Sequence, residues 1–226
     1  MTDKHQHTRV NKMMLGFLER PALQWLARRM PAWVTPDVLT SIGFFGTILI
    51  SISYILTNQN PAFLWLASLG LVINWFGDSL DGTLARFRKI ERPRYGFFID
   101  HTTDALGEVL IMVGIAISPY VDFRIAMIAL VGYLLLSNLV YITTYVKNEF
   151  RISYIGLGPT EIRLILIITN AIVFFSGNTY VQTKIGNFTV YDFVLTALAV
   201  LLFSVVLVMT FVTSRQIAEE EKNDRS

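Results

Sequence analysis

The chain of 226 residues is 53% hydrophobic and only 16% charged, with a formal net charge of +2. Soluble domains carry about 25% charged residues, so the composition argues against a soluble protein and favours an all-α integral membrane protein. The absence of cysteine excludes disulfides and cysteine-ligated metal sites. Nothing in the small net charge suggests a nucleic-acid partner.

The first predicted element is an amphipathic helix over residues 12–30, inside a cytoplasmic N-terminal segment 1–36. A helix with an apolar face and a basic face is typical of a segment lying on the cytoplasmic leaflet. The alternative is a soluble helix that packs on the rest of the protein. The apolar face would comprise Met14, Phe17, Leu18, Leu23, Trp25 and Leu26, and the polar face Arg20, Arg28 and Arg29.

Apolar runs of near-bilayer length follow, and they predict a six-helix transmembrane domain over residues 37–214. Turn-forming Pro, Gly, Asn and Ser residues separate the runs. The final residues, 215–226, are highly charged and predict a disordered tail. The six predicted spans are 37–57, 62–84, 97–118, 123–146, 160–177 and 192–213.

The distribution of Lys and Arg between the predicted spans indicates the orientation. The loop after the second span holds five basic residues against one acid, Glu91, and the loop after the fourth holds Lys147 and Arg151. The alternate loops hold at most one basic residue each. Both termini and the two basic loops are therefore predicted to be cytoplasmic. The basic residues of the first of these loops are Arg86, Arg88, Lys89, Arg92 and Arg94.

Four aspartates flank this basic loop. Asp78 and Asp81 are three residues apart near the end of the second span, and Asp100 and Asp104 are four apart at the start of the third. On a helix each spacing puts both side chains on one face. The loop can bring the two faces together, so the carboxylates are expected to converge near the cytoplasmic face of the membrane.

Four converging carboxylates would repel one another and are costly near a membrane, unless a cation neutralises them. Their hard oxygen ligands suit Mg²⁺ or Mn²⁺, and four of them can hold two ions that clamp a diphosphate. Gly82 and Ala85 lie on the same face and would let a bulky ligand approach, while Arg86 can reach a phosphate oxygen. The alternatives are a solvated helix end or an ion pathway in a transporter.

The pattern Asp78-x2-Asp81-Gly82-x2-Ala85-Arg86-x9-Gly96-x3-Asp100-x3-Asp104 resembles the signature of the CDP-alcohol phosphotransferase family. Six spans and a cytoplasmic amphipathic start are also features of that family. The segment TPDVLT ahead of the first span is similar to the family's Pro-Asn-x-Leu/Ile-Thr segment, although Asp37 replaces the usual Asn.

This resemblance implies an enzyme that transfers a phosphoryl-alcohol group from a CDP-alcohol to an acceptor alcohol, with release of CMP, in phospholipid synthesis. One of the two alcohols would be a lipid, and a homodimer is implied as well. Asp104 would be both a metal-site carboxylate and the general base. The implied metal ligands are Asp78, Asp81, Asp100 and Asp104, and the implied CDP-binding residues are Asp81, Gly82, Ala85 and Arg86.

Two features lean toward a donor such as CDP-choline or CDP-ethanolamine. His101 follows Asp100 as in the Asp-His-x-x-Asp of choline and ethanolamine phosphotransferases, and Thr160-Glu161 resembles their Thr-Glu segment. His101 could assist Asp104 as proton acceptor or simply hydrogen-bond a neighbouring group. Glu161 could pair with an ammonium group or serve as an acid at a helix N-terminus.

The alternative is transfer from CDP-diacylglycerol to a polar alcohol such as inositol phosphate, glycerol phosphate or serine. Lys147 and Arg151 could then bind an acceptor phosphate, or they could be ordinary positive-inside charge. For an ammonium head group, the four aromatic residues Trp75, Tyr133, Tyr141 and Tyr145 could instead form a cation–π site.

Two further hypotheses belong to other classes of protein. An intramembrane prenyltransferase also uses aspartates and Mg²⁺, and Asn74-x3-Asp78-x2-Asp81 faintly resembles its motif. That reading leaves Arg86 unexplained and lacks a second aspartate-rich motif. A non-enzymatic ion carrier is the more distant alternative, and it would move metal across a membrane without any nucleotide.

Overall fold

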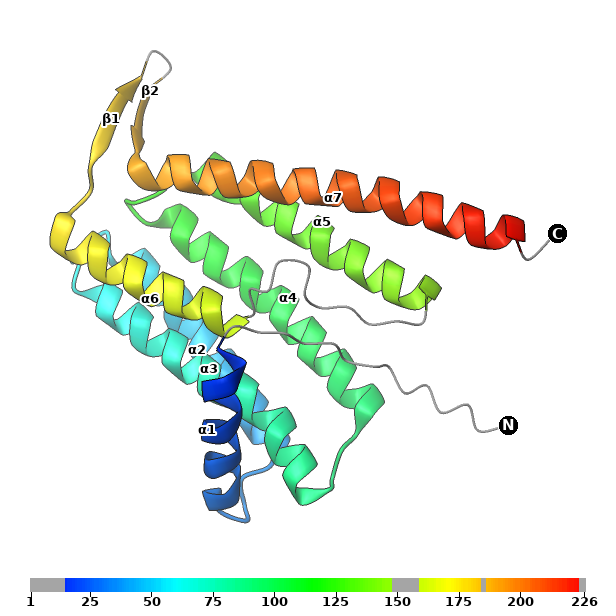
Figure 1. Cartoon of the computed structure of the whole chain (residues 1–226). Coiled ribbons are helices and arrows are strands. Elements are labelled where there is room, and N and C mark those ends of the chain that lie inside the picture. Colours follow the sequence, from blue (N-terminus) through cyan, green and yellow to red (C-terminus); the bar gives the residue numbers. More distant parts are fainter. Residues whose placement is uncertain (1–14, 148–158, 184–185, 224–226) are drawn as a thin grey trace.

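A computed structural model describes residues 15–147, 159–183 and 186–223 of the chain. Within these residues the fold is helical except for one short hairpin (Figure 1). A helix occupies each of the six positions predicted for a span. The helices are α1 (Gly16–Arg29), α2 (Pro36–Leu56), α3 (Phe63–Arg88), α4 (Pro93–Ile117), α5 (Phe123–Lys147), α6 (Pro159–Ser176) and α7 (Val190–Asn223), and the strands are β1 (Tyr180–Thr183) and β2 (Gly186–Thr189).

The principal helix contacts follow the order α6, α3, α2, α4, α5, α7, and α1 packs on α3. Helix α4 therefore lies between two groups, with α2 on one side and α5 on the other (Figure 1). The hairpin lies at the end of the molecule opposite to α1 and to the turn that joins α3 to α4. This arrangement gives α4 access to residues from both groups.

Five of the described helices, α2, α3, α5, α6 and α7, are long and apolar enough to cross a membrane. Their number and hydropathy make the chain an integral membrane protein. Helix α4 is long enough but carries Asp100, Asp104 and Glu108, and it is not among the five. Glu108 accepts a hydrogen bond from Tyr133 of α5, which gives this acid a partner inside the bundle. The sixth span and the orientation of the termini remain predictions.

The contact between α2 and α3 depends on glycine. A Cβ at Gly46 would lie 2.6 Å from the backbone nitrogen of Asn74, and a Cβ at Gly77 would overlap the backbone of Gly43. Only hydrogen at these positions allows the two backbones to come this close. The close approach fixes the position of α3 against α2 within one turn of Asp78.

The described part of α1 docks through Leu23 and Ala27 into a core cluster shared with α2 and α3. Phe17, Leu18 and Trp25 point away from the bundle and are exposed. The predicted single apolar face is therefore wrong in one respect, because Leu23 lies on the docked side and not with Phe17 and Trp25. Helical spacing separates the two sets by roughly half a turn. A position on the membrane surface stays a prediction, and Met14 lies outside the described residues.

Arg88, at the end of α3, holds the linker between α1 and α2. Its guanidinium donates to the backbone carbonyl oxygens of Met30 at 3.0 Å and Pro31 at 2.8 Å. It also donates to the carbonyl oxygens of Ala32 and Val34. The sequence suggested only positive-inside charge here. In the fold, Arg88 instead ties the end of α3 to the linker between α1 and α2.

Two features of the C-terminal part differ from the prediction. Strands β1 and β2 pair antiparallel, with Tyr180 opposite Thr189. Helix α7 continues to Asn223, although a disordered tail was expected from residue 215. Ala, Glu and Lys favour helix, and Lys147 of α5 donates to Gln216 at 2.8 Å, which ties the extension to the bundle.

Candidate active site

The end of α3 and the start of α4 bring the four aspartates into one region. Helix α3 ends at Arg88 and is capped by Lys89, which adopts the left-handed conformation with φ of 57°, and α4 begins after Arg92. The connection is thus shorter than the sequence pattern suggested. The carboxylate of Asp81 interacts electrostatically with those of Asp78 and Asp100. The carboxylate of Asp104 interacts with the same two carboxylates.

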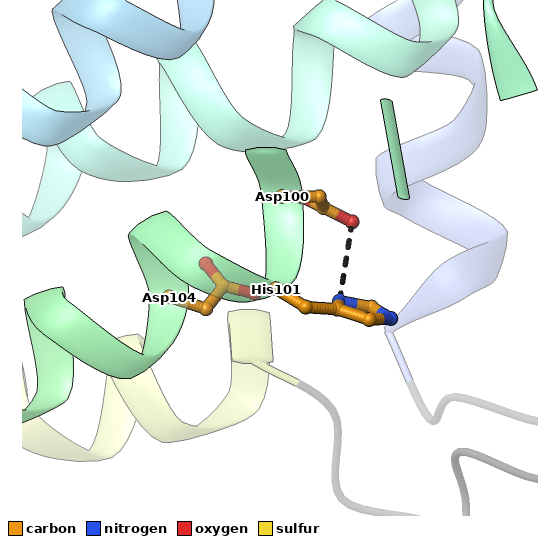
Figure 2. Close-up of side chains that lie close together, drawn as sticks. All are labelled: Asp100, His101 and Asp104. Carbon is orange, nitrogen blue, oxygen red and sulfur yellow. Dashed lines mark ion pairs between the residues drawn. The ribbon is translucent and has the colours of Figure 1, made fainter. Parts of the chain in front are cut away.

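Three groups on α4 lie especially close together (Figure 2). One ligand atom each of Asp100, His101 and Asp104 lies within 4.8 Å of the others. Figure 2 shows the His101 ring turned toward Asp100, with 3.8 Å between its Nδ1 and Oδ2 of Asp100. The ring stacks on Tyr141 of α5 at 5.1 Å and meets Phe97 edge-on at 4.1 Å. His101 is therefore held by its neighbours, and Asp104 is the exposed member of the group.

Asp81 is oriented by donors on both of its oxygens. Thr40 of α2 donates its hydroxyl to Oδ2 of Asp81 at 2.6 Å. The backbone N–H of Gly82 donates to Oδ1. Hydrogen bonds of this kind fix the direction of a carboxylate that ligates a metal. Thr40 belongs to the segment TPDVLT, yet its contact with an aspartate 41 residues away could not be inferred from that segment.

Asp78 is engaged by an arginine from α6. Arg163 donates from Nη2 to Oδ2 of Asp78 at 2.5 Å and from Nε to Oδ1 of Asn74 at 2.7 Å. Its side chain is 13% exposed. The Nη1 atom is buried and has no hydrogen-bond partner among the described residues. No special role for Arg163 could be predicted from the sequence, because a single base near a helix start resembles positive-inside charge.

The residues expected to contact CDP lie along the last turns of α3. A Cβ at Gly82 would come within 3.3 Å of an Nη atom of Arg86, so the guanidinium folds back over this glycine. Arg86 also donates to Thr83 at 3.3 Å. Ala85 is half-buried on the same helix. Asp37, which stands at the usual Asn position, forms an ion pair with Arg92 at the end of the α3–α4 connection.

The donor set fits a divalent cation. The α4 group offers two carboxylates and an imidazole whose ligand atoms lie within 4.8 Å of one another, and carboxylate oxygens are preferred by Mg²⁺ and Mn²⁺. The hydrogen bond from Thr40 orients the carboxylate of Asp81, as is expected for a metal ligand. Asp78 and Asp81 lie outside the compact α4 group. The four carboxylates predicted to converge therefore lie in one region of the described structure but do not form a single compact cluster.

Comparison with known proteins gives the family. The model of the family described as CDP-alcohol phosphatidyltransferase matches residues 33–211, which covers most of the chain and all four aspartates. The chain belongs to the CDP-alcohol phosphatidyltransferase family. It is therefore a transferase of substituted phosphate groups, as the resemblance of the aspartate pattern predicted.

Three relatives illustrate the range of this family. An archaetidylinositol phosphate synthase of Pyrococcus horikoshii is 32% identical over 157 residues, covering 70% of this chain and 76% of that protein. A cholinephosphotransferase 1 of Danio rerio is 27% identical over 71% of this chain, but the match spans only 44% of that longer protein. A phosphatidylinositol phosphate synthase of Cutibacterium acnes is 39% identical over 87 residues, which is 38% of this chain.

Several residues considered for substrate recognition in this CDP-alcohol phosphatidyltransferase have structural partners. Glu161 is only 6% exposed and accepts a hydrogen bond from the backbone N–H of Leu15 at 2.8 Å. The Trp75 indole donates to Glu19 of α1 at 2.8 Å. Lys147 contacts Gln216 and Glu220 on α7. Arg151 lies outside the described residues.

Proposed function

We propose that this family member transfers the lipid phosphoryl group of a CDP-linked lipid alcohol, such as CDP-diacylglycerol, to a polar acceptor alcohol, with inositol phosphate as the leading acceptor. The observation that carries the proposal is the match to the archaetidylinositol phosphate synthase, which covers 70% of this chain and 76% of the relative. The match to the phosphatidylinositol phosphate synthase points the same way. This proposal differs from the CDP-choline-like donor that His101 and the segment Thr160-Glu161 favoured.

The contacts of Glu161 and the aromatic residues support the replacement. An ammonium head group would need an accessible carboxylate or an aromatic enclosure. Glu161 is buried and accepts from Leu15, and Trp75 contacts α1 while Tyr141 stacks on His101. Tyr145 is 87% exposed. Among the described residues, Glu161, Trp75 and Tyr141 therefore have separate partners and do not form a common cation site.

A phosphorylated acceptor needs a cation, and Arg163 is the best candidate. Its guanidinium reaches Asp78 with one nitrogen and leaves Nη1 without a partner among the described residues. Arginine suits phosphate because its planar fork can donate two parallel hydrogen bonds. Lys147 is less suitable, since Gln216 and Glu220 already contact its ammonium group.

The proposed reaction breaks the diphosphate of the donor. The acceptor hydroxyl oxygen attacks the phosphorus attached to the lipid alcohol, and the bond from this phosphorus to the oxygen of CMP breaks. Asp104 takes the proton of the hydroxyl, and Arg86 offsets charge on the diphosphate. Asp78, Asp81, Asp100 and Asp104 would hold Mg²⁺ or Mn²⁺, which neutralises the negative charge that develops on the phosphate oxygens.

Cholinephosphotransferase activity is the second candidate. The cholinephosphotransferase matches cover 71–78% of this chain in their longer alignments, and His101 follows Asp100 as it does in that class. The position of His101 between Tyr141 and Phe97 gives the ring a packing role that requires no catalytic one.

The test is a donor and acceptor panel with the full chain in lipid nanodiscs. CDP-diacylglycerol would be combined with inositol phosphate, glycerol phosphate, serine or no acceptor, and CDP-choline and CDP-ethanolamine with diacylglycerol. We expect CMP release with CDP-diacylglycerol and inositol phosphate, only when Mg²⁺ or Mn²⁺ is added. CMP release confined to CDP-choline or CDP-ethanolamine would overturn the choice of substrate. Metal flux into vesicles without CMP release from any donor would favour the ion carrier.

A further inference from the structure

The carboxylate of Glu19 joins the N-terminal helix α1 to the two helices that carry the Arg163–Asp78 pair. A single oxygen, Oε1, accepts from Nε1 of Trp75 in α3 at 2.8 Å and from the hydroxyl of Thr160 in α6 at 2.6 Å. The next residue of α6, Glu161, accepts from the first backbone N–H of the described chain, that of Leu15, at 2.8 Å. Glu19 of α1 is thus hydrogen-bonded to both α3 and α6.

The Glu19 contacts have the same spacing as the contacts of Arg163. Trp75 precedes Asp78 by three residues in α3, and Thr160 precedes Arg163 by three residues in α6. Residues three apart lie on neighbouring turns of one helix face. The two bridges between α3 and α6, one through Glu19 and one through Arg163, therefore stand one turn apart.

We propose that Glu19 is a positioning residue for the active site. It holds the start of α6 against α3, and this keeps Arg163 in register with Asp78 and Asn74. Glu19 touches neither substrate nor metal in this proposal, which rests on the proposed function for the meaning of the Asp78 site. Helix α1 then belongs to the catalytic domain, in addition to any contact that it makes with the membrane surface.

The chemistry of the contact suits this role. Trp75 can only donate through its indole N–H, and it packs beside the core cluster of Leu23 and Leu80. An acceptor must come from another element, and Glu19 supplies it while accepting from Thr160 with the same atom. Removing the carboxylate leaves the indole without this acceptor, and α6 loses the hydroxyl contact that sets its position.

The experiment measures Mn²⁺ binding to the full chain in nanodiscs by electron paramagnetic resonance, alongside CMP release. We expect Glu19→Ala to raise the Mn²⁺ concentration for half-saturation by about 10- to 100-fold, the range typical of residues that orient metal ligands. Glu19→Gln keeps an acceptor oxygen and should recover most of the affinity. Gln24→Ala, an exposed change on the same helix, should match the unmodified protein.

Two further comparisons keep the test decisive if Glu19→Ala does not fold. Thr160→Val removes one donor and should weaken Mn²⁺ binding, whereas Thr160→Ser should not. Adding Arg163→Gln to Thr160→Val should cause less loss than the sum of the two single changes, because in this proposal the Thr160 contact acts through the position of Arg163. Unchanged Mn²⁺ affinity in Glu19→Ala and Thr160→Val, or fully additive losses, would overturn the proposal. Normal Mn²⁺ binding without CMP release would reject the proposed function and leave the Glu19 result standing.

Discussion

At the scale of single residues, Asp104 and His101 have different surroundings although they are three positions apart on α4. Asp104 is exposed, whereas His101 packs between Phe97 and Tyr141 with its Nδ1 3.8 Å from Asp100. A group that accepts a proton from a substrate must be reachable by that substrate. Asp104 meets this condition more directly, so the roles predicted for the two residues are unequal.

Asp104→Asn is expected to lower the rate of CMP release by about 10²- to 10⁴-fold, the usual contribution of a general base. The amide keeps the shape of the side chain but does not accept the proton of the hydroxyl. Binding of CDP, measured by calorimetry, should change little. Glu91→Gln is the control, since it neutralises an exposed acid in the α3–α4 connection. Equal losses of CDP binding and rate would mean that Asp104 is only structural.

Thr40→Val is expected to raise the concentration of Mg²⁺ or Mn²⁺ required for half-maximal activity by about 10- to 100-fold. The change removes the hydroxyl that donates to Asp81 at 2.6 Å while keeping the volume of the side chain. Titration of CMP release with metal checks this expectation, and Thr40→Ser should behave as the unmodified protein does. An unchanged metal requirement would show that Asp81 needs no support from α2.

At the scale of elements, the positions of the aspartates depend on how closely α2 approaches α3. Gly46 lies against the backbone of Asn74, and Gly43 lies against Gly77. Asn74 donates from its side chain to Thr47 of α2 at 3.1 Å and accepts from Arg163. The glycine contact and the polar contacts therefore occur on the same turn of α3, so a shift of this helix would move the site.

Gly46→Ala is expected to lower the free energy of unfolding by about 1–3 kcal/mol, the cost typical of overpacking. The new methyl group would come within 2.6 Å of a backbone nitrogen that cannot rotate away. Gly96→Ala is the matched control, since a Cβ at Gly96 meets nothing within 4 Å. Thermal unfolding in detergent, followed by circular dichroism, measures both variants. Equal stability would argue that α2 and α3 can separate without cost.

At the scale of the whole molecule, α4 lies between the helices α2, α3 and α6 on one side and α5 and α7 on the other. Asp104 interacts electrostatically with Asp78 of α3, while His101 and Glu108 contact Tyr141 and Tyr133 of α5. The site thus depends on both groups of helices. A homodimer, implied by the family resemblance, stays a prediction.

Chelation of divalent cations is expected to abolish CMP release, and Mg²⁺ or Mn²⁺ should restore it. The physical reason is that Asp78, Asp81, Asp100 and Asp104 would otherwise repel the diphosphate of the donor. The measurement is CMP release after treatment with excess EDTA and again after each cation is added back. A rate that survives chelation would contradict the metal-dependent mechanism.

The sequence by itself determined the membrane class, the positions of six helices and the region of the aspartates. These properties are local, because the length of an apolar run and the 3.6-residue period depend only on residues that are close in sequence. The sequence also predicted the family, because the aspartate pattern lies within one continuous stretch. The short hairpin and the helical end of α7 were missed, since strands of four residues and charged helix ends give weak signals.

Only the tertiary structure decided the partners of these residues. Thr40 reaches Asp81, Arg163 reaches Asp78, and Glu19 reaches both Trp75 and Thr160. Each contact joins residues at least 41 positions apart, and such pairs depend on which helices pack together and in what register. The spacing of residues along one helix fixes which side chains share a face, but it does not fix what that face meets.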